Sequence, residues 1–145
     1  MPSPKKLLLL LLPVAALAAT TQVSTDKPII NFRLPAFTAD GYRSWLVRGS
    51  EARFSAKNQI GIRELTLSIF PGKADNEKVE TLILSPTAVV RPDESLVTGP
   101  GTIRVINDSF EASGTDWRYA HKDKRVSINK NVRVTFRAEM KDILK

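Results

Sequence analysis

The sequence of 145 residues predicts an all-β fold, a sandwich or barrel of short antiparallel strands. After residue 31, no stretch repeats its apolar residues with the period of an α-helix. Glycine, proline, asparagine and aspartate recur every 8 to 15 residues, and β-branched residues fill the intervals. Short strands separated by regular turn signals are typical of β-sandwiches and β-barrels.

Each strand is predicted where apolar and polar residues alternate between two turn signals. Eight segments meet this condition: 42–48, 52–56, 60–70, 78–84, 88–91, 102–106, 116–120 and 124–137. The predicted turns are Ala39-Asp40-Gly41, Pro71-Gly72, Asn76, Ser85-Pro86, Pro92-Asp93, Gly99-Pro100-Gly101, Asn107-Asp108 and Ser113-Gly114.

The segment 60–70 changes the phase of its alternation. Leu65, Leu67 and Ile69 are apolar at odd positions, whereas Ile60 and Ile62 are apolar at even positions. A bulge or a corner near Arg63-Glu64 would put both sets on one face.

The last segment, VSINKNVRVTF at 126–136, is apolar at every even position except Lys130. We therefore expect a turn or bulge at Asn129-Lys130-Asn131 that splits it into two short strands. Lys124, Arg133 and Arg137 would protect an exposed sheet edge from aggregation. The alternative is an edge that pairs with a partner strand by β-augmentation.

The chain also contains a repeated pattern. Three registers that start at Ala52, Ala88 and Trp117 carry apolar residues at the same later offsets. These residues are Phe54, Val90 and Tyr119, then Leu67, Ile103 and Val132, then Ile69, Val105 and Val134. The pattern predicts a hairpin-like unit, stacked three times along an axis.

The N-terminal segment 1–18 has the features of a signal peptide. Lys5 and Lys6 precede a short apolar run, and small residues follow at Ala16 to Ala18. The apolar run is too short for a membrane span, so cleavage is expected, with a retained anchor as the alternative. Without both lysines the net charge falls from +7 to +5, which is 20 basic minus 15 acidic residues. Residues 19–31 are expected to form a linker, 32–137 the domain and 138–145 a tail.

No enzymatic or cofactor chemistry is predicted. The chain has no cysteine, and its one histidine, His121, is expected to sit in solvent. One histidine without cysteine would need three carboxylates to complete a zinc site, and the carboxylates are scattered. No nucleophile motif or phosphate-binding motif appears. Basic residues are spread along the chain, which argues against nucleic acid. Glycan binding would need Trp45 and Trp117 exposed on one face.

Three segments resemble the OstA-like domains of lipopolysaccharide export. GTDWRYAHKDKRVSINKNVRVTF (114–136) is similar to their last unit, and SPTAVVRPDESLVTGPGTIRVI (85–106) to a middle unit. FRLPAFTADGYRSWLVRGSEARF (32–54) resembles the opening of the LptC branch. The resemblance implies a twisted, open β-jelly roll of stacked antiparallel strands. Its N-terminus departs from the LptC pattern of a lasting membrane anchor, so a soluble LptA-like carrier is the other expectation.

The resemblance implies a non-catalytic periplasmic protein, soluble or associated with the inner membrane. Such a protein would bind lipopolysaccharide, receive it from the inner-membrane Lpt ABC transporter and pass it to an LptA-like bridge protein. The interior residues expected to form the lipid groove are Phe54, Leu67, Ile69, Ile103, Val105, Val132, Val134 and Phe136, with Trp45 and Trp117 at its ends. The alternatives are a closed core without ligand, and an exported β-domain that docks partners through a strand edge.

Overall fold

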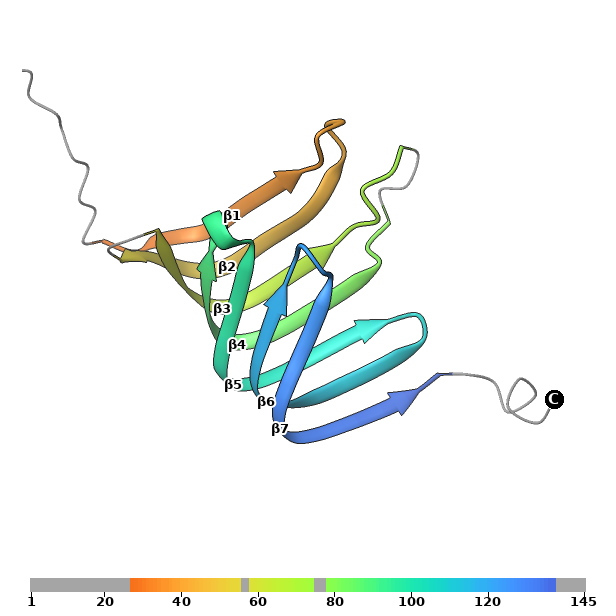
Figure 1. The fold of residues 1–145 in the computed structure, drawn as a ribbon. Coiled ribbons are helices and arrows are strands. Elements are labelled where there is room, and N and C mark those ends of the chain that lie inside the picture. The colour runs from red at the N-terminus through yellow and green to blue at the C-terminus, as the bar shows by residue number, and fades with distance from the viewer. Residues whose placement is uncertain (1–26, 56–57, 75–77, 138–145) are drawn as a thin grey trace, which may run out of the picture.

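A computed structural model describes residues 27–55, 58–74 and 78–137 as one antiparallel sheet of seven strands (Figure 1). The strands lie side by side in sequence order: β1 (Ile29–Phe37), β2 (Arg43–Ser55), β3 (Gln59–Ile69), β4 (Thr81–Arg91), β5 (Leu96–Asn107), β6 (Phe110–Ala120) and β7 (Arg125–Phe136). A single turn of 3-10 helix, η1 (Pro92–Glu94), joins β4 to β5. The fold is all-β, as predicted, and the sheet is open, in keeping with a twisted jelly-roll-like arrangement.

The strands bend near their middles, so the sheet folds back into two walls, most visibly at β5, β6 and β7 (Figure 1). The first wall contains residues 51–55, 59–63, 87–91, 96–99, 116–120 and 125–129, and the second contains 43–48, 65–69, 81–85, 102–107, 110–113 and 132–136. Four non-glycine residues with positive φ lie at these bends: Asn31, Glu64, Asp116 and Asn131. Such backbone geometry is costly, and asparagine and aspartate tolerate it best.

The core lies between the two walls. Ile62, Val90 and Val97 face it from the first wall and are buried. Residues at matching positions of successive strands face it from the second wall: Val47, Leu67, Ile83 and Val105. Each buried aliphatic side chain stabilises the fold by about 1.5–3 kcal/mol relative to exposure, so this shared interior holds the walls together.

Several predicted turns are bends within strands. Ser85-Pro86, Gly99-Pro100-Gly101 and Ser113-Gly114 lie inside β4, β5 and β6. The predicted pairs of short strands at 42–48 and 52–56, and at 78–84 and 88–91, are therefore the continuous strands β2 and β4. The expected boundary between linker and domain at residue 31 falls within β1, which the sequence reading missed.

The corner predicted near Arg63-Glu64 is confirmed, because Glu64 has a positive φ of 52° and the buried positions change phase there. The predicted break at Asn129-Lys130-Asn131 is half right. Arg133 pairs with Ser113 and Lys130 pairs with Thr115, which leaves one extra residue on β7. This is a bulge, but β7 continues through it as one strand.

The predicted repeat corresponds to the hairpins β2–β3, β4–β5 and β6–β7, which lie next to one another in the sheet. Its three starting residues, Ala52, Ala88 and Trp117, are all buried in the first wall. The proposed signal peptide and tail lie outside the described residues. Within the described part of the chain, none of the helical structure reaches the length and apolarity of a membrane span.

Candidate binding slot at the β7 end of the sheet

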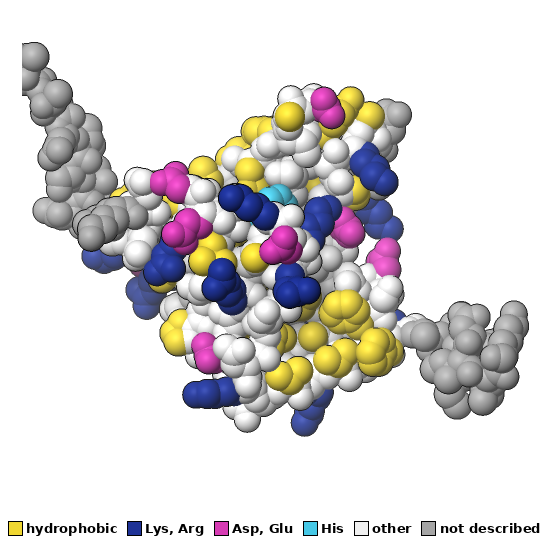
Figure 2. Space-filling model, in the orientation of Figure 1, with side chains coloured by type: hydrophobic (Ala, Val, Ile, Leu, Met, Phe, Trp, Pro, Cys, Tyr) yellow, Lys and Arg dark blue, Asp and Glu magenta, His cyan; other side chains and the backbone are white. Residues whose placement is uncertain are grey.

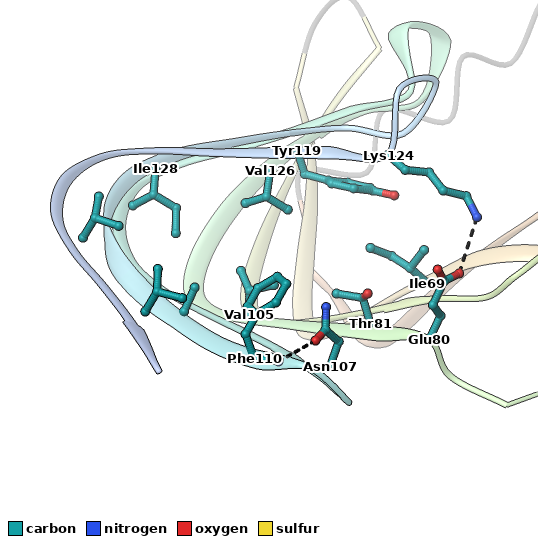
Figure 3. Close-up of a pocket in the computed structure, with 13 residues that line it drawn as sticks. Ile69, Glu80, Thr81, Val105, Asn107, Phe110, Tyr119, Lys124, Val126 and Ile128 are labelled. Atoms are coloured by element: carbon teal, nitrogen blue, oxygen red, sulfur yellow. Dashed lines mark hydrogen bonds and ion pairs between the residues drawn. The ribbon is translucent and has the colours of Figure 1, made fainter. Parts of the chain in front are cut away.

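The two walls enclose an open slot of about 470 Å³ where β6 and β7 end the sheet (Figure 3). Its volume is within the 300–1,000 Å³ typical of ligand pockets. Most of its lining is apolar, and the lining residues are Ile69, Glu80, Thr81, Val105, Asn107, Phe110, Ala112, Tyr119, Lys124, Val126, Ile128, Val132 and Val134. Figure 2 shows hydrophobic side chains gathered at the lower right of the view, where Figure 1 has the bent halves of β6 and β7.

The slot is open because β7 is the last strand of the part of the chain that the structure describes. Leu67, Ile103 and Val132 occupy equivalent positions in three successive hairpins, and their exposed fractions are 0%, 1% and 54%. The first two are covered by neighbouring strands, whereas within the described residues β7 pairs with β6 alone. The same inward-facing pattern that fills the core elsewhere is therefore left uncovered at this end.

One end of the slot is polar. Lys124, in the turn between β6 and β7, places its Nζ 3.5 Å from Oε2 of Glu80, which immediately precedes β4 (Figure 3). This ion pair joins the two walls across the end of the slot. Both side chains are about half exposed, so the pair contributes little to stability. Thr81 and Asn107 line the same end.

An aromatic cluster adjoins this polar end. The hydroxyl of Tyr119 lies 2.8 Å from Nδ1 of His121, and the imidazole stacks on the indole of Trp45. Burial raises the pKa of Tyr119, and the negative charge of Glu80 adds to this effect. Burial lowers the pKa of His121, and the positive charge of Lys124 lowers it further. The expectation that His121 sits in solvent is therefore wrong.

The structure divides the expected groove residues into three groups. Ile69, Val105, Val132 and Val134 line the slot. Four others lie in the packed core: Trp45, Leu67, Ile103 and Trp117.

Phe54 and Phe136 lie outside both the slot lining and the buried core. They are 52% and 71% exposed, so neither is an interior residue in this chain. Phe54 packs edge-on against Phe32 near the opposite end of the sheet, where β1 and β2 meet. Phe136 is at the end of the uncovered half of β7, where no later strand of the described residues shields it.

The sequence reading missed several lining residues. Phe110 and Ala112 come from β6, and Val126 and Ile128 come from the first half of β7. The alternation of apolar residues was visible in β7, but the start of β6 lies between two predicted turns and was assigned to no strand. Lys124 carried no apolar signal, because its place in the slot depends on the turn that brings it opposite Glu80.

The described residues hold no group of three or more histidine, cysteine or carboxylate side chains that could bind a metal ion. Trp45 and Trp117 are both buried, which removes the exposed aromatic face that glycan binding would need. No protein-family model matches the chain, and no curated protein matches it. The fold and site therefore define an open β-sheet with an apolar slot at one edge and a charged pair at the slot's polar end.

Proposed function

We propose that this protein is a periplasmic lipid-binding component of lipopolysaccharide transport, which holds acyl chains in the slot at the β7 end. The observation that carries the proposal is the uncovered row of apolar side chains on the inner face of β7, opposite the apolar residues of β6. The resemblance of the sequence to OstA-like domains gives the ligand class.

The physical basis is the transfer of hydrocarbon out of water. Each buried CH₂ group contributes about 0.8 kcal/mol to binding, so even part of an acyl chain gains several kcal/mol in such a slot. Val132 and Val134 are half exposed in the free protein, and a bound chain would cover them. Because one side stays open, a lipid with several chains can enter sideways and extend past the end of the sheet.

The free edge of β7 gives the slot a route for transfer. A strand from an LptA-like bridge protein, paired with β7, would extend both the sheet and the apolar slot. Lipid from the inner-membrane ABC transporter would then move between equivalent slots without covalent chemistry.

Photo-crosslinking in cells tests this proposal. A benzophenone amino acid at Val134 faces the slot, whereas the same group at Arg133 lies on the opposite face of β7. We expect adducts to lipopolysaccharide from position 134 and far fewer from position 133. Lipid carriage in the slot would be contradicted if neither position gave lipid adducts, or if both positions gave them equally.

The second candidate is an exported β-domain that docks protein partners through its edge and binds no lipid. The outer edge of β7, which pairs with no other described strand, and the strong exposure of Phe136 favour it. In the same experiment this function predicts protein adducts near β7 without lipid adducts at Val134.

A further inference from the structure

We propose that the polar end of the slot binds the anionic group of an amphiphile, with Lys124 and Asn107 as its recognition residues. This inference rests on the proposed function, because it assumes that an apolar chain occupies the rest of the slot. It adds the charge of the ligand's head and the direction in which the ligand lies.

The side chain of Asn107 is fixed as a hydrogen-bond donor toward the slot. Its Oδ1 accepts hydrogen bonds from the backbone N–H groups of Ser109 and Phe110, each at 2.9 Å. These bonds settle which end of the amide is oxygen, and Figure 3 draws the nitrogen on the slot side. The Nδ2 group therefore offers hydrogen bonds to a ligand and leaves no acceptor there.

Lys124 supplies the positive charge. Its ammonium lies 3.5 Å from Glu80, and this pair is half exposed and weakly held. A carboxylate or phosphate that enters the slot can take the place of Glu80 beside Lys124, while Glu80 turns into water. Hydrogen bonds to charged groups are about twice as strong as neutral ones, so the exchange favours an anion that also contacts Asn107.

The other polar groups at this end of the slot are also compatible with an anionic ligand. Thr81 has a hydroxyl that can donate to an anion, and the hydroxyl of Tyr119 is already paired with His121. Glu80 is the one carboxylate among the lining residues. The apolar residues of β7 begin beyond Lys124 at Val126, so the tail of the ligand would run along β7 toward the open edge.

Calorimetric titration of the full chain with dodecanoate, dodecyl phosphate and dodecanol tests the inference. The two anions are kept below their micellar concentrations and the alcohol below its solubility limit. The three probes share one tail and differ in the head. We expect both anions to bind about tenfold more tightly than the alcohol, the difference that one charge-assisted hydrogen bond provides. Comparison of the two anions separates a carboxylate from a phosphate preference.

Two variants with opposite expected effects show which residues cause the preference for anions. Lys124→Gln should remove the preference for the anions, and Glu80→Gln should increase it, because the competing carboxylate is gone. Lys122→Gln is the matched control, since Lys122 belongs to the same turn but does not line the slot.

The outcomes of the titration distinguish failure of this inference from failure of the proposed function. Equal binding of all three probes, or an anion preference that survives Lys124→Gln, overturns this inference and leaves lipid binding intact. Binding of none of them counts against the proposed function and this inference together. If Glu80→Gln binds the anions more weakly than the parent chain, Glu80 does not compete with the ligand for Lys124, and the inference is also overturned.

Discussion

The indole ring of Trp45 lies flat against the imidazole ring of His121, with ring centroids 4.8 Å apart and planes 9° apart. Trp45 belongs to β2 and His121 follows β6, so the stack joins strands that are four apart in the sheet. The backbone N–H of His121 also donates to the carbonyl of Ser95, which lies before β5. This contact closes the interior beside the polar end of the slot.

This stack predicts that the protein loses stability in mild acid. Burial and Lys124 lower the pKa of His121 from its ordinary value of 6.5 in the folded chain. The unfolded chain protonates His121 near 6.5, so below that pH it binds more protons than the folded chain does. The free energy of unfolding should therefore fall as pH drops from about 6.5 toward the lowered pKa.

Urea unfolding at several pH values measures this effect, and His121→Gln is the comparison because glutamine does not titrate. The variant should lose most of the slope just below pH 6.5. Glu111 does not interfere, because the hydrogen bond from Arg104 lowers its pKa from 4.5 and its stabilising effect is lost only in stronger acid. An equal slope in variant and parent protein would exclude His121 as the cause.

A second prediction concerns the bend in β5. A Cβ atom added at Gly99 would lie 2.5 Å from Nε1 of Trp117, which is buried and cannot move without disturbing the core. Gly99→Ala should therefore destabilise the fold by about 1–3 kcal/mol, the usual cost of overpacking. Gly101 is the matched control in the same Gly-Pro-Gly sequence, because its nearest contact is Thr87 at 4.0 Å.

Denaturant midpoints of both variants, with near-ultraviolet circular dichroism of the tryptophans, measure this difference. Gly101→Ala should leave the spectrum and the midpoint nearly unchanged. Equal effects of the two substitutions would mean that general loss of backbone freedom, and not the contact with Trp117, sets the requirement for glycine.

Sequence reasoning found the strand content and the repeated hairpin, because alternation and turn residues are local signals. It misread Gly99-Pro100-Gly101 as a turn before a strand, because a bend within a long strand uses the same residues as a turn. Only the pairing of Gly99 with Trp117 in β6 distinguishes the two, and that pairing is not local.

The slot was foreseen only in part, for a related reason. Ile103 and Val132 occupy the same place in their repeats, and nothing in either residue tells which one is covered. Coverage depends on whether another strand follows. The polar end of the slot is even harder to predict from the sequence, because Lys124 and Glu80 meet only when the two walls are folded against each other.

The last prediction concerns the free edge of β7. Arg133 separates Val132 from Val134 and lies on the outer face, while both valines lie on the slot side. Arg133→Val would make the strand apolar on both faces next to an unpaired edge. Charged residues protect such edges, so we expect this variant to self-associate at concentrations where the parent chain does not.

Sedimentation velocity over a range of concentrations measures this association. Arg118→Val is the matched control, because Arg118 is an exposed arginine on β6, whose two edges are paired with β5 and β7. It adds the same apolar surface without a free backbone edge, so it should not self-associate more than the parent chain. If both variants associate equally, apolar surface alone drives the effect. If only Arg133→Val associates, the backbone of β7 is competent to pair with another strand, as both candidate functions require.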